Sequence, residues 1–290
     1  FWESLKRPKK LNFVELGPGN GDFCLVLLKT LKNFPDVLNS INIMLYEKSD
    51  RLKAIQKKRI ISQKVSWIKN LKKIEKGPVI FFGNEFFDAI PVKQFKKLKN
   101  SFFEKKYTLD KNFKIKQIFK KASSSDIKVI KSYKSLKRLK FIEFPKLGFQ
   151  ELKKITKKIS ELGGCILLID YGYLTSNNQN TLQSVMKHKK NKLFNNLGRA
   201  DITAHVNFAL LNEFFLKNNL KTKNLISQKE FLENMGLIER ANILAKKMKF
   251  TQQTDLYLRI QRLLSPKMMG ELFKVILAYN FKNNNFEGFK

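Results

Sequence analysis

Residues 11–22 read Leu-Asn-Phe-Val-Glu-Leu-Gly-Pro-Gly-Asn-Gly-Asp, and this stretch decides the fold. An apolar run carries one acid, Glu15, near its end. Three glycines follow at alternate positions: Gly17, Gly19 and Gly21. Apolar residues with helical spacing begin directly afterwards, at Phe23. This order predicts a buried strand that turns through glycines into a helix.

Such a turn gathers backbone N–H groups and the positive end of a helix at one point, where a ligand can approach the bare main chain. The spacing is E-x-G-x-G-x-G, and Asp22 stands where a dinucleotide fingerprint would have its third glycine. Acids on both sides of the glycines favour a cationic or polyhydroxyl ligand over a pyrophosphate. An ordinary glycine-rich turn stays open as the alternative.

Composition sets the broad class. The chain has 290 residues, 43% of them hydrophobic, which is enough for a substantial α/β core. No apolar run approaches the ~18 residues of a transmembrane helix, so we expect no membrane insertion. Cys24 and Cys165 lie in apolar stretches without metal-ligand spacing, which predicts a reducing compartment and no metal site. Because residue 1 is Phe, we expect the sequence to be a fragment.

The net charge of +34 would suit a nucleic-acid partner. However, only 8 of the 58 basic residues are arginine, the better reader of phosphate and guanine. The lysines are spread along the chain, and Asn, Ile and Phe are also abundant, as an AT-rich genome would produce. We therefore interpret the charge as solvated surface and expect no specific nucleic-acid partner.

The order of elements predicts an α/β protein with a Rossmann-like, mostly parallel, doubly wound sheet. Residues 1–92 and 145–206 are expected to form the core. Residues 93–144, where aromatic residues alternate with lysines, are expected to be an insertion of antiparallel hairpins. Residues 207–290 are expected to be mostly helical and to pack on the core. The expected elements include a strand over 181–188 and helices over 203–218, 228–248 and 267–279.

Two residues at strand ends are candidates for an adenosine-like ligand. Glu47 ends the expected second strand, and ligands of such sheets lie beyond the carboxyl ends of the strands. A carboxylate there can accept two hydrogen bonds from ribose hydroxyls, and a surface acid paired with lysine is the alternative. Trp67 ends the expected third strand and could cover an adenine ring, although plain packing explains an aromatic there equally well.

The expected fourth strand leads into Asn84, Glu85 and Asp88. Two carboxylates three residues apart could bind a guanidinium or ammonium group, or take a proton from it. The alternative is helix capping, with Asn84 as N-cap and the acids in a first helical turn. His205, one of two histidines, is kept as a candidate catalytic residue, although a lone histidine is usually structural.

Several motifs occur together in one order: Val14-Glu-Leu-Gly-Pro-Gly-Asn-Gly21, Glu47 with Ser49, Asn84-Glu-Phe-Phe-Asp-Ala-Ile-Pro91, Asp170-Tyr-Gly172, Arg199-Ala-Asp-Ile-Thr-Ala-His-Val206 and Ser265-Pro-Lys-Met-Met-Gly-Glu-Leu-Phe-Lys-Val275. With them the chain resembles the MidA-type class I S-adenosylmethionine (SAM) methyltransferases over nearly its whole length. That family includes a mitochondrial assembly factor acting on respiratory complex I.

The resemblance implies a class I fold, SAM as cofactor and, as for the mitochondrial member, protein arginine methylation. It implies that Gly17, Gly19, Gly21 and Glu47 belong to the cofactor site. The full set that we predict for this site adds Glu15, Pro18, Trp67 and Asn84. It also implies that Glu85 and Asp88 form the rim facing the methyl donor. These two acids and His205 are our catalytic candidates.

The expected partner is a protein substrate, with a complex I subunit and a homodimer included among the expectations. The expected location is the cytoplasm for a bacterial protein and the mitochondrial matrix for a eukaryotic one. Two rivals stay open: a nucleic-acid methyltransferase, and a non-catalytic SAM-binding assembly chaperone. Against the first, the fourth strand lacks the Asn-Pro-Pro-aromatic sequence that grips a flipped base.

Overall fold

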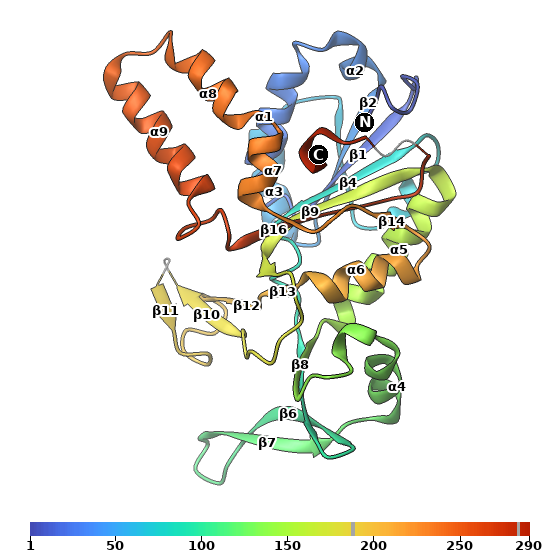
Figure 1. The fold of residues 1–290 in the computed structure, drawn as a ribbon, viewed down its shortest axis with the longest axis vertical. Coiled ribbons are helices and arrows are strands. Elements are labelled where there is room, and N and C mark those ends of the chain that lie inside the picture. The colour runs from blue at the N-terminus through green and yellow to red at the C-terminus, as the bar shows by residue number, and fades with distance from the viewer. Residues whose placement is uncertain (187–188, 283–284) are drawn as a thin grey trace.

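A computed structural model describes residues 1–186, 189–282 and 285–290. In these ranges the chain is built on a nine-stranded sheet with the order β14-β16-β9-β4-β1-β2-β3, in which β13 also pairs with β9 and β15 with β16 (Figure 1). Its strands are β1 (Leu11–Leu16), β2 (Ile41–Tyr46), β3 (Val65–Ile68), β4 (Val79–Asn84), β9 (Gly164–Tyr173), β13 (Val206–Asn207), β14 (Lys221–Thr222), β15 (Ile226–Ser227) and β16 (Phe273–Tyr279).

The middle of this sheet is parallel, as the sequence predicts. Strand β1 pairs in parallel with β2 on one side and β4 on the other, and β9 continues the parallel series beside β4. All six residues of β1 are buried. Strands covered on both faces need a continuous apolar run, so the single acid in β1, Glu15, marks a special position.

Helices cover both faces of the sheet, and β1 shows how they divide. Leu11 and Phe13 pack in a core with Cys24 of α1, whereas Val14 packs in a second core with Leu152 of α5. One face carries α1 (Asp22–Leu31), α2 (Pro35–Ser40), α3 (Asp50–Arg59) and α7 (Gln228–Asn234), and the other carries α5 (Lys146–Leu162) and α6 (Phe208–Lys217).

The predicted helix over 267–279 is wrong, because Phe273–Tyr279 is strand β16. It runs antiparallel to β9, and all of its residues are buried. A strand buried on both faces has no alternation of polar and apolar residues, so its pattern cannot be told from a buried helix. The C-terminal portion thus completes the core sheet as well as packing on it.

Other C-terminal helices also differ from the expectation. The expected helix over 228–248 is divided into α7 and α8 (Leu237–Ala245) at Gly236, whose φ is +75°. The expected helix over 203–218 begins only at Phe208, where the Asn207 side chain caps α6. An unexpected helix, α9 (Phe250–Leu264), lies beside α8, and the two project away from the sheet (Figure 1).

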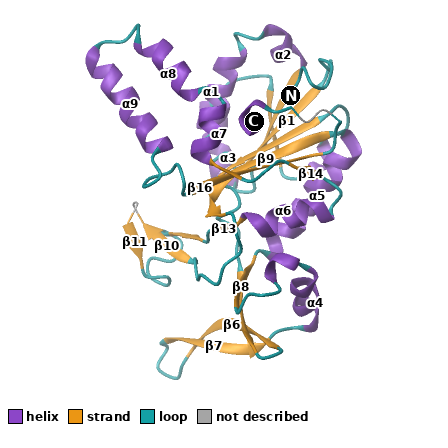
Figure 2. Ribbon diagram, viewed as in Figure 1, coloured by secondary structure: helices purple, strands orange, loops and turns teal. Residues whose placement is uncertain are grey.

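Residues 93–121 form the expected antiparallel hairpins: β5 (Lys93–Leu98), β6 (Ser101–Leu109) and β7 (Ile115–Lys121). With β8 (Phe141–Phe144) they make a four-stranded sheet next to α4 (Ser124–Ser132) (Figure 2). A smaller sheet joins β10 (Gln183–Met186), β11 (Lys189–Asn191) and β12 (Asp201–Thr203). The end of the strand expected over 181–188 lies outside the described residues. The division into units at 92, 144 and 206 stays a prediction.

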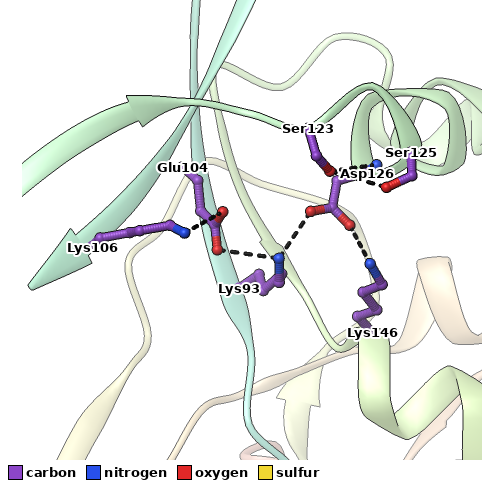
Figure 3. A network of polar contacts seen from close by, with 7 residues as sticks. All are labelled: Lys93, Glu104, Lys106, Ser123, Ser125, Asp126 and Lys146. Carbon is purple, nitrogen blue, oxygen red and sulfur yellow. Dashed lines mark hydrogen bonds and ion pairs between the residues drawn. The ribbon is translucent and has the colours of Figure 1, made fainter.

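A buried acid connects this insertion to α5 (Figure 3). Asp126 accepts ion-pair contacts from Lys93 at 2.8 Å and from Lys146 at 2.7 Å. Burial alone would raise the pKa of Asp126. The two ammonium groups lower it by more than burial raises it, so the pKa is about 2. Lys93 also contacts Glu104 of β6 at 3.2 Å. The network therefore joins two insertion strands and α4 to the first residue of α5.

The short 3₁₀ helices are η1 (Leu71–Lys73), η2 (Lys134–Leu136) and η3 (Glu287–Phe289). Within the described ranges, none of the helices combines the length and apolar character that crossing a bilayer requires.

Candidate active site at the carboxyl ends of β1, β2, β4 and β9

The glycine loop joins β1 to α1, and its three glycines all have positive φ. A Cβ on Gly21 would lie 2.7 Å from Ile60 Cδ1, and one on Gly17 would lie 3.2 Å from Phe86. A Cβ on Gly19 would meet nothing within 4 Å. A side chain at Gly21 would thus displace Ile60 and one at Gly17 would press on the Phe86 ring, whereas Gly19 leaves open space above the main chain. The Pro18 carbonyl closes the turn by accepting the N–H of Gly21 at 2.7 Å.

Glu47 follows β2 and is buried next to this loop. Its Oε1 accepts the N–H of Ser49 at 2.7 Å, and its Oε2 accepts a hydrogen bond from Gln56 Nε2 at 3.1 Å. The same Gln56 nitrogen donates to the Gly19 carbonyl at 2.8 Å. The alternative of a surface acid paired with lysine is wrong, because Glu47 is 7% exposed and its contacts are a backbone amide and a buried glutamine.

Trp67, at the end of β3, joins the same network. Its indole N–H donates to Gln56 Oε1 at 2.9 Å, and the Lys57 ammonium lies 5.8 Å from the centre of its ring. Trp67 is half-buried. The structure therefore connects the ends of β2 and β3 to the glycine loop through one side chain, that of Gln56, which sequence reasoning missed.

Glu15 carries an unpaired oxygen beside the loop. It is 5% exposed, and its Oε2 is buried without a hydrogen-bond partner. Burial, assisted by the charge of Asp22, raises the pKa of Glu15 to about 7. A buried polar atom left unpaired is costly, so it points to a partner that completes the site.

Strand β4 ends at Asn84, and a turn follows in place of the helix that the capping alternative required. Glu85 has a positive φ of +50° and is exposed, whereas Asp88 is 6% exposed. Asn84 Nδ2 donates to Glu85 Oε1 at 3.4 Å. Helix capping therefore does not explain these acids.

The turn is held by Asp170 of β9. One carboxylate oxygen, Oδ2, accepts the N–H groups of Phe87 at 2.7 Å and Asp88 at 3.2 Å, and Oδ1 accepts the N–H of Tyr171 at 3.0 Å. Burial and the charge of Asp88 raise the pKa of Asp170. Burial also raises the pKa of Asp88 to about 6, and the charge of Glu85 adds to this effect. The carboxyl groups of Glu85, Asp88 and Asp170 thus lie together at the carboxyl ends of β4 and β9.

Tyr171 follows Asp170 and lies near both Glu85 and His205. Burial, followed by the charges of Glu85 and Asp88, raises the pKa of Tyr171 to about 12. The rings of Tyr171 and His205 are stacked with centroids 6.5 Å apart. The main chain approaches the acids at Ala204, whose N–H donates to the Asp88 carbonyl at 3.1 Å. Burial lowers the pKa of His205, which keeps its ring neutral at pH 7.

A cavity of about 400 Å³ opens beside the glycine loop. Gly17 and Glu47 line it from the sheet, Phe86 and Ile90 line it from the turn after β4, and Glu151 lines it from α5. Glu151 accepts a hydrogen bond from the Tyr46 hydroxyl, which ties α5 to the end of β2. The cavity has the place and size of a small-molecule site at the switch point of an α/β sheet.

Comparisons with known proteins agree with this geometry. Residues 1–226 match the model of the family described as "Putative S-adenosyl-L-methionine-dependent methyltransferase". The chain belongs to this family.

Its relatives include mitochondrial proteins. The chain is similar to the mitochondrial protein arginine methyltransferase NDUFAF7 of Xenopus laevis, with 26% identity over 94% of this chain and 68% of that protein. The human NDUFAF7 protein is also 26% identical, over 94% of this chain and 67% of its own length.

Among solved structures, a Burkholderia thailandensis protein bound to S-adenosyl-homocysteine (SAH) superposes with a TM-score of 0.81 at 22% identity, over 99% of this chain and 76% of that one. This likeness establishes the fold. The order of the sheet and the antiparallel β16 are thus those of a Rossmann-like SAM-dependent methyltransferase.

The site residues of this methyltransferase fit SAM, the cofactor of its family. Gly19 leaves the loop open, and Glu15 offers an unpaired oxygen that would suit a cation. Glu47 has further acceptor capacity, because each carboxylate oxygen carries two lone pairs and accepts one hydrogen bond from the protein. The acceptor atoms at the loop and strand ends therefore match a ligand with an ammonium group and ribose hydroxyls.

Sequence reasoning identified the residues at strand ends and missed those that support them. Asp170 and Tyr171 belong to a motif that the sequence displays, Asp170-Tyr-Gly172, without indicating a role. Gln56 lies among lysines on α3 and gives no signal in the sequence.

Proposed function

We propose that this protein is a SAM-dependent protein arginine N-methyltransferase. The observation that carries the proposal is the pair of acids after β4, Glu85 and Asp88, beside a cofactor site in a family whose relatives include protein arginine methyltransferases. The alternative of first-turn helix acids is removed, because no helix follows β4 directly.

The cofactor end of the site would be formed by the loop and the strand ends. We assign Glu47 to the ribose hydroxyls, and Glu15 to the positively charged end of SAM. The main chain at Gly17, Pro18 and Gly19 would lie against the cofactor, with Gly21 shaping the loop. Trp67 and Asn84 complete the predicted set. When bound, SAM supplies an electrophilic methyl group on a sulfonium.

The acids would hold and orient the substrate guanidinium. Glu85 is exposed and free to meet a cation entering from solvent, and Asp88 lies deeper. Charge-assisted hydrogen bonds from a guanidinium to two carboxylates fix its plane as well as its position. A pKa of about 6 leaves Asp88 mostly ionised at pH 7 and close to the value at which a general base works best. Asp88 can therefore accept the proton that the methylated nitrogen loses.

His205 has a different relation to the site. Its ring lies beside that of Tyr171 and is neutral at pH 7. We propose that His205 lines the substrate side, where it borders a cavity of about 530 Å³ with Thr181 and Ser184.

The acid pair can be tested by separating binding from turnover. In Glu85→Gln and Asp88→Asn, we expect SAH affinity by calorimetry to stay within about threefold, while methyl transfer falls by roughly 10²–10⁴-fold. Transfer is measured with labelled SAM and a purified respiratory complex I preparation, followed by mass spectrometry for methylarginine. Asp36→Asn, an exposed acid on α2, is the control for loss of a negative charge.

Normal turnover by both variants would eliminate the arginine clamp. Intact SAH binding by the unaltered protein without any methylated product would favour an assembly chaperone that binds SAM. A complex I subunit as substrate and a homodimer are part of the proposal. Because the eukaryotic relatives are mitochondrial, we propose the mitochondrial matrix for a eukaryotic source, and the cytoplasm for a bacterial one.

A further inference from the structure

The side chain of Gln56 lies buried against the glycine loop, Glu47 and Trp67. It is completely buried, with 0% of its surface exposed. Its carbonyl oxygen accepts the Trp67 indole N–H at 2.9 Å, and its amide nitrogen donates to Gly19 O at 2.8 Å and to Glu47 Oε2 at 3.1 Å. One side chain therefore contacts three elements of the site that are far apart in the sequence.

The orientation of this amide is fixed by its partners. The Trp67 indole can only donate, so the oxygen of Gln56 must face it. The Gly19 carbonyl and the Glu47 carboxylate accept hydrogen bonds, so the NH₂ group must face them. A flipped amide would lose all three hydrogen bonds. Trp67 thus sets the direction in which Gln56 donates.

The end of α3 holds the glycine loop from behind at further points. Arg59 donates to the Asn20 carbonyl at 2.7 Å and contacts the Asp22 carboxylate at 2.6 Å. The Ile60 side chain occupies the space beside Gly21. Arg59 reaches the loop from the exposed side and does not contact Glu47, whereas Gln56 joins the loop and Glu47 inside the core.

We propose that Gln56 is a positioning residue, which holds the Glu47 carboxylate and the glycine loop in the relative arrangement that the cofactor requires. The inference rests on the proposed cofactor site. A carboxylate shared between a fixed NH₂ donor and the Ser49 N–H cannot rotate freely, so its remaining lone pairs point in defined directions. Preorganisation of this kind lowers the cost of ordering on binding.

The test compares SAH affinity by calorimetry. In Gln56→Met we expect SAH affinity to fall by at least about tenfold, with Glu47→Gln causing a similar fall. The double variant should bind SAH at most about threefold more weakly than the weaker-binding single variant. The reason is that the effects of two residues that act through one contact do not add. Independent, multiplying losses would show that Gln56 does not act through Glu47.

Trp67 provides a readout in the protein without ligand. In a Trp2→Phe background, Trp67 is the remaining tryptophan, and we expect Gln56→Met to shift its emission because its indole loses a buried partner. Lys58→Met, at an exposed position of the same helix, is the control: it should change SAH affinity by less than about threefold, with no shift in emission.

A second variant guards against misfolding. Removal of Gln56 leaves the Trp67 indole N–H without its partner, which could itself disturb the fold. The Gln56→Met change is therefore repeated in a Trp67→Phe background. Trp67→Phe alone is the reference for this pair. A further loss of at least about tenfold in SAH affinity supports the proposal, and equal affinity overturns it. If the unaltered protein does not bind SAH, the proposed function fails. If it binds SAH and Gln56→Met binds equally well, only the inference about Gln56 fails.

Discussion

Glu15 is a buried acid with one oxygen atom that has no hydrogen-bond partner in the part of the protein that the structure describes. It stands in a strand whose other residues are apolar or neutral, and one of its oxygens is buried without a hydrogen bond. A folded-state pKa near 7, above the ordinary 4.5, means that the folded protein holds this proton more tightly than the unfolded chain does. Stability without ligand therefore falls as pH rises between these two values.

The corresponding experiment is Glu15→Gln. The glutamine has no group that titrates here, so the variant does not lose stability as the pH rises. We expect its unfolding free energy, relative to that of the unaltered protein, to increase by roughly 2–4 kcal/mol between pH 4.5 and pH 7–8. Chemical denaturation at a series of pH values measures the difference between the two proteins. A constant gap across the series would show that Glu15 is not the group responsible.

Gly19 and Gly21 are matched in conformation and differ in surroundings. Both have positive φ, so a side chain at either costs about 1–2 kcal/mol of strain. In Gly19→Val the new side chain enters open space above the loop, and we expect the thermal shift with SAH to disappear. In Gly21→Val it meets Ile60, and we expect a larger loss of stability. A full SAH shift in Gly19→Val would place the cofactor elsewhere.

Site residues could be predicted from the sequence where they stand directly after an apolar strand, in the turn that follows it. Glu47 and the glycines follow apolar runs, and parallel strands bring their ends together. Gln56 could not be predicted, because its partners Gly19, Glu47 and Trp67 come together only in the folded chain. The same is true of Asp170, whose partners are backbone amides far away in the sequence.

Among the elements, Asp126 adds ionic contacts between the insertion and α5 to the aromatic packing of Tyr133 and Phe144 on Phe149. We expect Asp126→Asn to lower the unfolding free energy by roughly 1.5–3 kcal/mol at pH 7, because a buried, charge-assisted pair of contacts is lost. Asp255→Asn, in an exposed pair with Arg259, is the control and should cost less than about 0.5 kcal/mol.

The contribution of Asp126 also has a defined pH range. Its pKa is about 2 in the folded protein and 3.8 ordinarily, so its stabilisation is present above about pH 4 and is lost as pH falls toward 2. Chemical denaturation at pH 7, 4 and 2 measures the difference in unfolding free energy between Asp126→Asn and the unaltered protein. This difference should become small at pH 2. A gap that persists at pH 2 would contradict the ionic origin.

Element prediction succeeded where one face of a strand or helix is polar, and failed where both faces are apolar. The hairpin strands of the insertion alternate, and they were predicted. Strand β16 does not alternate, so its apolar pattern is also that of a buried helix. Helix α9 carries apolar residues at helical spacing, such as Leu256, Ile260 and Leu263, while others, including Phe250 and Leu258, are exposed.

For the whole molecule, the charge of +34 separates the methyltransferase proposal from a nucleic-acid function. If the lysines are solvated surface, binding to labelled RNA and DNA duplexes should be weak and indifferent to sequence. It should fall steeply between about 50 and about 200 mM salt. Fluorescence anisotropy at several salt concentrations measures this. Tight, sequence-selective binding at physiological salt would support a nucleic-acid methyltransferase.

The place of β16 has a consequence for synthesis on the ribosome. Strand β9 ends at Tyr173, but the strand that covers its second edge begins only at Phe273. While the intervening chain emerges, β9 presents an apolar edge that can pair with any other strand. A stop codon after α9 would release a chain that still contains the glycine loop, Glu47 and both acids of the turn. Such a product would be lost through aggregation, although no residue of the proposed chemistry had changed.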